Sequence, residues 1–326
     1  MRIAIYGVGA IGGWMGARLA ARGHAVSAVA RGATLQALHT QGLQLTEAGV
    51  QTTHRIRVEA EPSALGAQDL VVVAVKAPAL RGVAQRIAPL LGPHTVVLSA
   101  MNGVPWWFLQ GVGGALQGQS LNCVDAGGEI ARCIPAQQVI GCVVHAACAT
   151  SGPAQVLHNF GNKLIIGEPS GARSERVLAM AHTLTEAGFE APVSDQIQKD
   201  IWYKLWGNMT MNPISALTGA TIDKILGDDL LRGFVSAVML EAKEIGARIG
   251  IPIDQQPEDR HAVTQKLGAF KTSMLQDVEA GRAVELDALV SAVRELGQRT
   301  GVPTPMTDAL LGLARVQARG LGLYPA

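Results

Sequence analysis

The sequence predicts an α/β fold in which a Rossmann-type doubly wound sheet is followed by an all-α helical domain. A short apolar run at the N-terminus leads directly into a glycine-rich turn. Apolar, β-branched runs then recur as far as residue 193, and helical patterns replace them beyond residue 195. The 326 residues are enough for two domains. We expect an NADP-binding domain at 1–194 and a helical substrate domain at 195–326.

The composition is that of a folded protein with almost no net charge. Hydrophobic residues make up 48% of the chain, charged residues 16%, and the net charge is +1. A general nucleic-acid binder or a protein of acidic membrane surfaces would carry a basic excess. The longest apolar runs have the length of strands and are too short to span a bilayer, and the N-terminus does not resemble a signal peptide. We therefore expect a cytoplasmic protein that binds neither nucleic acid nor membrane.

The cysteines show neither a disulfide pattern nor a metal-binding pattern. Cys123, Cys133, Cys142 and Cys148 contain no C-x-x-C spacing. His145 lies near two of them, but no second pair of histidine and cysteine at suitable spacing would complete a metal site. The sequence predicts reduced thiols and no metal.

The first predicted element is a buried strand at 2–6, which is followed at once by Gly7-Val8-Gly9-Ala10-Ile11-Gly12. This is the G-x-G-x-x-G of dinucleotide sites in the strand–turn–helix context that it requires. The first glycine permits the tight turn, the second lets a pyrophosphate approach the backbone, and the third lets the helix pack closely on the strand. The start of the following helix would offer N–H groups to the phosphates. We predict that this loop binds a dinucleotide.

The second predicted strand, at 25–30, ends where NADP sites differ from NAD sites. An NAD site has an acidic residue there for the ribose hydroxyls, but this chain has no acidic residue before Glu47. Arg31 occupies the position instead, and a guanidinium can bind the 2′-phosphate of NADP. Arg31 could also be an ordinary surface arginine. The missing carboxylate nevertheless favours NADP.

Two further strands are expected to end at the ligand-binding edge of the sheet. The run at 69–76 ends on Lys76, and the run at 95–101 is followed by Asn102 and Gly103. Ligands of open α/β sheets bind beyond the carboxyl ends of the strands, so both polar residues are candidates for cofactor or substrate contact. The alternatives are a lysine that snorkels at a strand end and an Asn-Gly turn.

The remaining patterns are weaker in the first domain and helical in the second. Before the central strands we expect a helix at 34–40 and exposed strands or a hairpin at 42–45 and 53–58. The later part of the first domain predicts antiparallel strands at 139–147, 154–158 and 163–166 with turns at 151–153 and 159–162, then a helix at 175–188 and a strand at 189–193. The second domain predicts helices at 196–211, 230–249, 261–279, 286–300 and 306–318.

The first helix of the second domain carries a polar stripe. Lys204, Asn208 and Asn212 recur every four residues and therefore share one helix face. Trp202 and Trp206 lie largely on other faces and are interpreted as packing. Lysine and asparagine are seldom buried without partners, so the stripe faces either water or a polar cleft. The dinucleotide site predicted in the other half of the chain favours the cleft.

These residues together resemble the ketopantoate reductase (2-dehydropantoate 2-reductase) family, which uses NADPH in pantothenate synthesis. The resemblance covers nearly the whole chain. Its most specific parts are Lys204-Leu205 with the two asparagines of the stripe, and Ser273-Met274-Leu275-Gln276-Asp277 followed by Glu285-Leu286-Asp287. It implies a Rossmann domain followed by a helical domain, with the active site between them.

The resemblance also implies a role for each candidate residue. Lys204 would be the general acid, and Glu285 would support the lysine and the substrate hydroxyl. Lys76 would lie beside cofactor and substrate, and Asn102 would contact both. The residues that would hold the substrate are Asn102, Asn208, Asn212 and Ser273.

The implied reaction transfers hydride from NADPH to the 2-oxo carbon of 2-dehydropantoate and gives (R)-pantoate. An unperturbed lysine has a pKa of about 10.4, so a charged Lys204 would stabilise the developing oxyanion and then protonate it. The aromatic run Trp106-Trp107-Phe108 departs from the family pattern, either as packing or as a change in the acyl pocket. The alternatives are a reductase of a bulkier 2-oxo acid and a protein that senses NADP without catalysis. A homodimer and closure of the domains around the ligands are also plausible.

Overall fold

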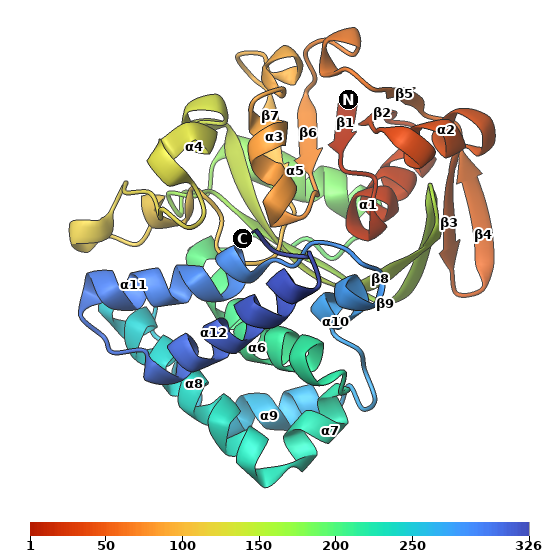
Figure 1. The fold of residues 1–326 in the computed structure, drawn as a ribbon. Coiled ribbons are helices and arrows are strands. Elements are labelled where there is room, and N and C mark those ends of the chain that lie inside the picture. The colour runs from red at the N-terminus through yellow and green to blue at the C-terminus, as the bar shows by residue number, and fades with distance from the viewer. Residues whose placement is uncertain (326) are drawn as a thin grey trace. The chain divides into compact units, whose positions relative to one another are not determined.

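The computed structural model describes residues 1–325, and the chain divides into two compact units. Unit 1 contains Met1–Met101 and Gly128–Ile197, and unit 2 contains Asn102–Gly127 and the chain from Gln198 onward. Unit 1 is built on a β-sheet and unit 2 on helices (Figure 1). The predicted fold class, a Rossmann-type sheet followed by a helical domain, is confirmed. Residues 102–127, which lie inside the predicted first domain, pack with the helical unit.

In the described residues of unit 1, nine strands form one sheet in the order β4-β3-β9-β8-β7-β6-β1-β2-β5. The strands from β8 to β5 in this order run parallel, whereas β9 is antiparallel to β8 and β4 to β3. The bounds are β1 (Arg2–Tyr6), β2 (Ala25–Val29), β3 (Leu43–Glu47), β4 (Val50–His54), β5 (Arg57–Glu59), β6 (Leu70–Val73), β7 (Val96–Ser99), β8 (Val139–Gly152) and β9 (Gln155–Gly167).

Helix α1 (Ala10–Ala21) packs very closely on the sheet of unit 1. A Cβ atom on Gly13 would lie 2.6 Å from Val156 Cγ2, and one on Gly16 would lie 3.1 Å from Ile5 Cγ1. Trp14, on the same helix, is fully buried. The small residues of α1 therefore allow the close contact that buries its large ones. The other helices of unit 1 are α2 (Gly32–Gln41), α3 (Leu80–Ala84), α4 (Glu129–Cys133) and α5 (Glu175–Glu186).

One prediction for the later part of unit 1 is confirmed in part, and two are wrong. The predicted antiparallel pairing is present between β8 and β9, although β8 joins the rest of the sheet by pairing with β7 in parallel. The turn predicted at 159–162 is part of the continuous strand β9, which pairs with β8 across a register shift near His145. A bulge of this kind accommodates turn-forming residues without ending a strand, and Gly161 within it has φ +77°. The strand predicted at 189–193 is reduced to isolated bridges at Glu190 and Val193.

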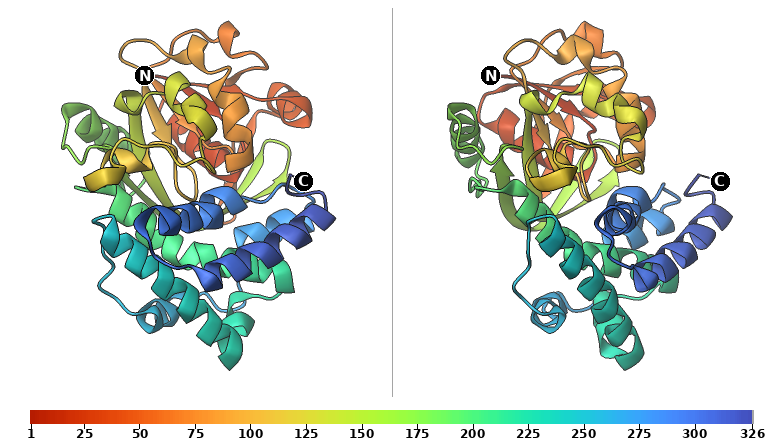
Figure 2. Two further views of the ribbon diagram at one scale, coloured as in Figure 1. Left: turned by 60° about the vertical axis from the view of Figure 1, so that its left-hand side comes forward. Right: turned by 90° about the vertical axis from the view of Figure 1, so that its left-hand side faces the viewer.

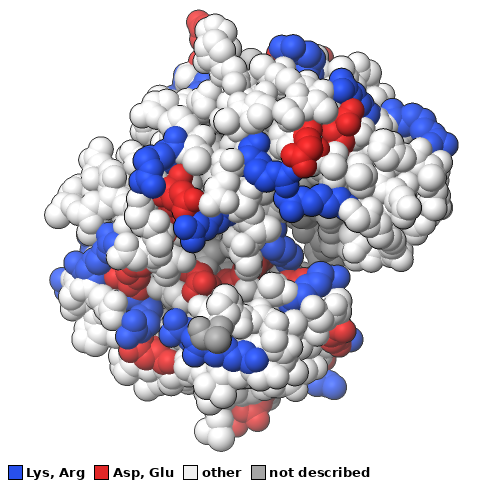
Figure 3. All heavy atoms as spheres, turned by 45° about the horizontal axis from the view of Figure 1, so that its top comes forward, with Lys and Arg blue, Asp and Glu red and all other residues white. Residues whose placement is uncertain are grey.

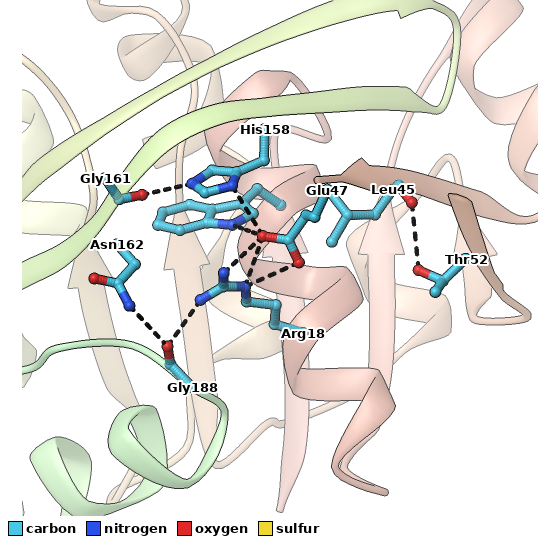
Figure 4. A network of polar contacts seen from close by, with 9 residues as sticks. Arg18, Leu45, Glu47, Thr52, His158, Gly161, Asn162 and Gly188 are labelled. Atoms are coloured by element: carbon cyan, nitrogen blue, oxygen red, sulfur yellow. Dashed lines mark hydrogen bonds and ion pairs between the residues drawn. The ribbon is translucent and has the colours of Figure 1, made fainter. Parts of the chain in front are cut away.

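A polar network fastens α1 to the outer strands β3 and β9 (Figure 4). The Glu47 carboxylate accepts from Arg18 Nη2 at 2.6 Å and from Trp14 Nε1 at 3.3 Å, and it lies 3.0 Å from His158 Nδ1. The His158 ring stacks on Trp14, and Arg18 also donates to the carbonyl of Gly188. Burial alone would raise the pKa of Glu47, but Arg18, Trp14 and His158 together lower it. The helix behind the glycine loop is thus held by a charged side chain as well as by packing.

In the described part of unit 2 the regular elements are all helical (Figure 2). The helix predicted at 261–279 is wrong, because residues 266–272 separate α9 from α10 and Thr272 begins the second helix by accepting from Leu275 N. The bounds are α6 (Ile197–Thr218), α7 (Ile222–Gly227), α8 (Asp229–Arg248), α9 (Pro257–Gln265), α10 (Ser273–Glu279), a π-helical turn (Asp287–Ser291), α11 (Ala292–Thr300) and α12 (Pro305–Gly320).

Two buried tryptophans of α6 join it to α8, as their positions outside the polar stripe predicted. Trp202 Nε1 donates to the carbonyl of Ala242 at 3.2 Å, and Trp206 Nε1 donates to that of Met239 at 2.7 Å. A Cβ atom on Gly246 would lie 2.4 Å from Trp202 Nε1, so this contact requires glycine. The packing turns the face that carries Lys204 away from α8.

Charged side chains of both signs are interspersed on the face drawn in Figure 3, and much of that face is uncharged. This distribution agrees with a net charge of +1 and 16% charged residues. Among the described residues, every helix is too short or too polar to cross a membrane.

Candidate active site

The three glycines of the loop after β1 have different surroundings. Gly7 has φ +103°, and a Cβ atom there would lie 2.7 Å from Val75 Cγ1. A Cβ atom on Gly12 would lie 2.1 Å from the carbonyl oxygen of Gly7. A Cβ atom on Gly9, in contrast, would meet no atom within 4 Å. The first and third glycines are therefore required by the fold, while the space beside the second glycine is open.

The loop lies at one edge of the sheet with two of the predicted basic residues. The glycine loop follows β1, Arg31 follows β2, and Lys76 lies three residues beyond the end of β6. Strand β1 pairs in parallel with both β2 and β6, so these three positions lie at the same edge of the sheet. Arg31 is exposed at the start of α2, whereas Lys76 is partly buried. Val8 and Ile11 of the loop pack against the hydrophobic core, and Ala10 begins α1. Unit 1 thus gathers its candidate cofactor residues where an open α/β sheet binds ligands.

The polar stripe of α6 is not an open solvated face. Asn212 is only 5% exposed, and Lys204 and Asn208 are partly buried. Lys204 Nζ donates to Asn102 Oδ1 at 2.8 Å. This hydrogen bond joins two candidate residues that are 102 positions apart in the sequence, and both belong to unit 2.

At the other end of the stripe, Asn212 meets Ser273, the first residue of α10. Asn212 Nδ2 lies 3.5 Å from Ser273 Oγ, which is the outer limit for a hydrogen bond. The carboxamide and the hydroxyl can both donate to an oxygen anion. The pair therefore offers two hydrogen-bond donors that are suited to a carboxylate.

Glu285 is buried, and the segment that follows it contacts the segment after Asn102. Gly103 has φ +82°, and a Cβ atom there would lie 2.6 Å from the carbonyl oxygen of Ala288. Val104 N donates to the same oxygen at 2.8 Å. Asn102-Gly103 is therefore not an exposed turn, because its backbone packs against the turn that follows Glu285. Three distant segments, near residues 102, 204 and 285, converge inside unit 2.

The aromatic run in this segment is interior packing. Trp106, Trp107 and Phe108 are 3%, 1% and 1% exposed. The Phe108 ring lies 6.0 Å from the ring of Trp202 on α6. These contacts agree with the packing interpretation of the run.

A clamp on α11, formed by Glu295 and Arg299, holds the later part of the 102–127 segment. The Glu295 carboxylate accepts from the backbone N–H groups of Asn122 at 2.8 Å and Cys123 at 2.9 Å. Arg299 pairs with Glu295 and donates to the carbonyl of Ser120. The sequence analysis missed this clamp, because Glu-x-x-x-Arg on a helix is also the pattern of an ordinary surface ion pair.

Glu295→Gln is expected to lower the free energy of unfolding at neutral pH by about 1–3 kcal/mol and to weaken its dependence on acid. Burial alone would raise the pKa of Glu295, but Cys123, Asn122 and Arg299 together lower it. A lowered carboxyl pKa contributes stability above the unfolded pKa of about 4.3, and this stability is lost as the pH falls further. Urea unfolding between neutral and acid pH measures the difference.

Glu244→Gln is the matched control, because Glu244 also pairs with an arginine four residues later, Arg248, but is 51% exposed. Its expected effect is below about 0.5 kcal/mol. Equal effects of the two substitutions would show that Glu295 acts only as a surface charge.

None of the four cysteines forms a disulfide. Burial, together with the charge of Glu47, raises the pKa of Cys148 to about 12, so this thiol stays protonated at neutral pH. The described residues contain no group of three or more histidine, cysteine or acidic side chains that could hold a metal ion.

Comparison with known proteins identifies the family. The family described as "Ketopantoate reductase PanE/ApbA" matches residues 3–171, and its C-terminal domain matches residues 196–318. The chain belongs to the ketopantoate reductase family. The resemblance that the sequence suggested is thereby confirmed.

Relatives of similar length support this family. A 2-dehydropantoate 2-reductase from Mesorhizobium japonicum is 48% identical over 325 residues, covering 99% of this chain and 100% of that protein. A crystal structure from Ralstonia solanacearum MolK2, assigned to the ketopantoate reductases, has 57% identity and a TM-score of 0.96 and covers 99% of both chains. D-mandelate dehydrogenase, in a ternary structure with NADH and anilino(oxo)acetate, has a TM-score of 0.86 over 99% of this chain and 100% of its own. At 23% identity this last likeness shows the fold alone.

Proposed function

We propose that this chain reduces 2-dehydropantoate to (R)-pantoate with NADPH as the hydride donor. The observation that carries the proposal is the hydrogen bond between Lys204 and Asn102 in a member of the ketopantoate reductase family. This bond fixes a lysine amine beside a second polar candidate and close to the turn after Glu285. Such a group can stabilise negative charge on a carbonyl oxygen and then supply a proton.

The cofactor is proposed to bind at the carboxyl edge of the unit 1 sheet. Its pyrophosphate would meet the backbone of the loop from Gly7 to Gly12, where the space beside Gly9 is open. Arg31 would bind the 2′-phosphate, and Lys76 would contact the nicotinamide end. The bound cofactor supplies the hydride, and the protein supplies orientation and electrostatics.

In unit 2 the proposed roles divide along the stripe. Lys204 is the general acid and Asn102 orients its amine by accepting one of its three N–H groups. Asn212 and Ser273 would bind the substrate carboxylate, and Asn208 a carbonyl or hydroxyl oxygen. Glu285 would hydrogen-bond the product hydroxyl and help to keep the lysine charged.

We also propose that residues 1–194 bind NADP and residues 195–326 bind substrate, that the protein is cytoplasmic, and that it forms a homodimer.

A panel of 2-oxo acids tests the proposed function. Oxidation of NADPH is followed by absorbance with 2-dehydropantoate and with bulkier or aromatic 2-oxo acids, and kcat/KM is compared. The highest value is expected for 2-dehydropantoate. A higher value for a bulkier acid would instead assign a related reductase, and turnover of none of them would leave a protein that only senses NADP.

Arg31→Ala is expected to raise KM for NADPH by roughly 10–100-fold, since a guanidinium–phosphate contact is a charge-assisted hydrogen bond. KM for NADH and kcat should change little, because neither depends on the 2′-phosphate. Arg22→Ala, an exposed arginine at the far end of α1, is the matched control. An unchanged preference for NADPH over NADH would refute the assignment of Arg31.

A further inference from the structure

The last described residues of the chain return from α12 to the segment that contains Glu285 (Figure 1). Val284 N donates to the carbonyl of Leu323 at 3.1 Å, and the Tyr324 hydroxyl donates to Asp287 Oδ1 at 2.5 Å. These two hydrogen bonds flank Glu285, one on the residue before it and one on the second residue after it. The backbone before Glu285 and the side chain of Asp287 after it are therefore both bonded to the same short tail, Leu321–Pro325.

The tail is itself held firmly to unit 2. The ring of Tyr324 lies 5.9 Å from the guanidinium of Arg315 and 5.7 Å from that of Arg319, within the range of cation–π contacts. Arg319 Nε donates to the carbonyl of Pro325, and Leu323 is 8% exposed. Burial and the hydrogen bond to Asp287 raise the pKa of Tyr324, so its hydroxyl remains a donor at neutral pH.

Asp287 connects the tail to an unusual turn. Its carboxylate accepts from Ser291 Oγ at 3.0 Å as well as from Tyr324, and Asp287–Ser291 is the π-helical turn before α11. Single π-helical turns are rare and often occur at functional sites, because they displace the residues around them from ordinary helical positions. A carboxylate bonded at both ends of this turn can hold that displacement.

From this turn a continuous set of contacts leads to the catalytic amine. Ala288, next to Asp287, accepts from Val104 N and touches Gly103. The preceding residue, Asn102, accepts from Lys204 Nζ. All these residues lie in unit 2. A series of hydrogen bonds and close backbone contacts therefore connects the tail with Asn102 and Lys204.

We infer that Tyr324 and Asp287 are positioning residues, which set the Glu285 segment and, through Ala288, the alignment of Asn102 with Lys204. The catalytic meaning of this inference rests on the proposed reductase function. The contact between the tail and the Glu285 segment does not rest on that function, because it can be measured without substrate. Neither side chain is given a step in the chemistry.

Tyr324→Phe tests the inference, because it removes one hydroxyl and keeps the ring within contact of both arginines. We expect kcat to fall about tenfold, as for the loss of one hydrogen bond to a charged group, with KM for NADPH within about twofold of the wild type. Asp287→Ala, which also loses the hydrogen bond from Ser291, should lower kcat at least as much. The double variant should be no worse than Asp287→Ala, because the hydroxyl of Tyr324 acts through Asp287. Asp287→Asn keeps an acceptor oxygen and should recover most of the activity.

Hydrogen exchange on the same variants supplies a readout that needs no substrate. In Tyr324→Phe the amides at 102–106 and 284–290 should exchange faster than in the wild type. The amides of Asn122 and Cys123, held by Glu295, are the internal control and should not change. Unchanged exchange at Val104 would overturn the inference, and so would a loss of thermal stability with full kcat. If the wild type reduces no 2-oxo acid, the proposed function fails while the exchange result still decides whether the tail positions this segment.

Discussion

Replacing Lys204 by alanine is expected to lower kcat by roughly 10²–10⁴-fold, the usual contribution of a general acid. The amine is partly buried and donates to Asn102, so its substitution removes a proton donor that is held in a fixed position. KM for NADPH should stay within about threefold, since the proposed cofactor contacts come from other residues. Steady-state kinetics with 2-dehydropantoate, together with a melting curve to confirm folding, measures the effect.

The matched control is Lys199→Ala, which removes the same charge from an exposed position on the same helix. It should leave kcat almost unchanged. Lys204→Arg keeps the positive charge but has a pKa above about 12, so it should stabilise the oxyanion and donate the proton poorly. Near-complete turnover by Lys204→Ala would remove the proton source from the proposed mechanism.

The features that sequence reasoning predicted correctly are those encoded in neighbouring residues. The glycine loop carries its strand, turn and helix within a few residues, and the structure gives Gly7, Gly9 and Gly12 the three environments that the motif requires. The stripe of Lys204, Asn208 and Asn212 depends only on the period of a helix. The family was also identified from the sequence, because its specific motifs are short stretches of neighbouring residues.

The errors have a different origin, because tertiary contacts overrode local preference. The pattern predicts that the first helix of the second domain ends at residue 211, yet α6 continues to Thr218 with Pro213 inside it, where a proline is normally unfavourable. The polar residues at 159–162 look like a turn, but pairing with β8 keeps them in a strand. The apolar spacing across 261–279 looks like one helix, although Thr272 begins a second one inside it.

The candidate site shows the same division between local and distant information. Asn102 and Lys204 were each identified from their own surroundings and assigned to one site by the resemblance, but no local pattern predicts the direct hydrogen bond between them across 102 positions. Glu295 and Tyr324 were missed, since their partners lie 172 and 37 positions away and each residue type is common on a protein surface. A single sequence identifies the chemical groups of a site, whereas the contacts that orient them require the fold.

Gly103→Ala is expected to lower kcat about 100-fold and to lower the free energy of unfolding by about 2–4 kcal/mol. Gly103 has φ +82°, which is costly for alanine, and its Cβ atom would lie 2.6 Å from the carbonyl oxygen and 2.7 Å from the Cβ of Ala288. The backbone must therefore move away from Ala288 and weaken the bond from Val104 N. Asn102 would move with it, and a displacement of about 1 Å at a catalytic contact can cost about two orders of magnitude in rate.

Gly113→Ala separates the two causes, because Gly113 lies in the same 102–127 segment and has φ +71°, but a Cβ atom there meets nothing within 4 Å. Both variants bear the strain of a positive φ, so both should be destabilised by about 1 kcal/mol or more. Only Gly103→Ala should also lose kcat, because only its methyl group displaces the residue bonded to Lys204. Equal kcat in the two variants would mean that the packing of Gly103 against Ala288 does not align Asn102 with the amine of Lys204.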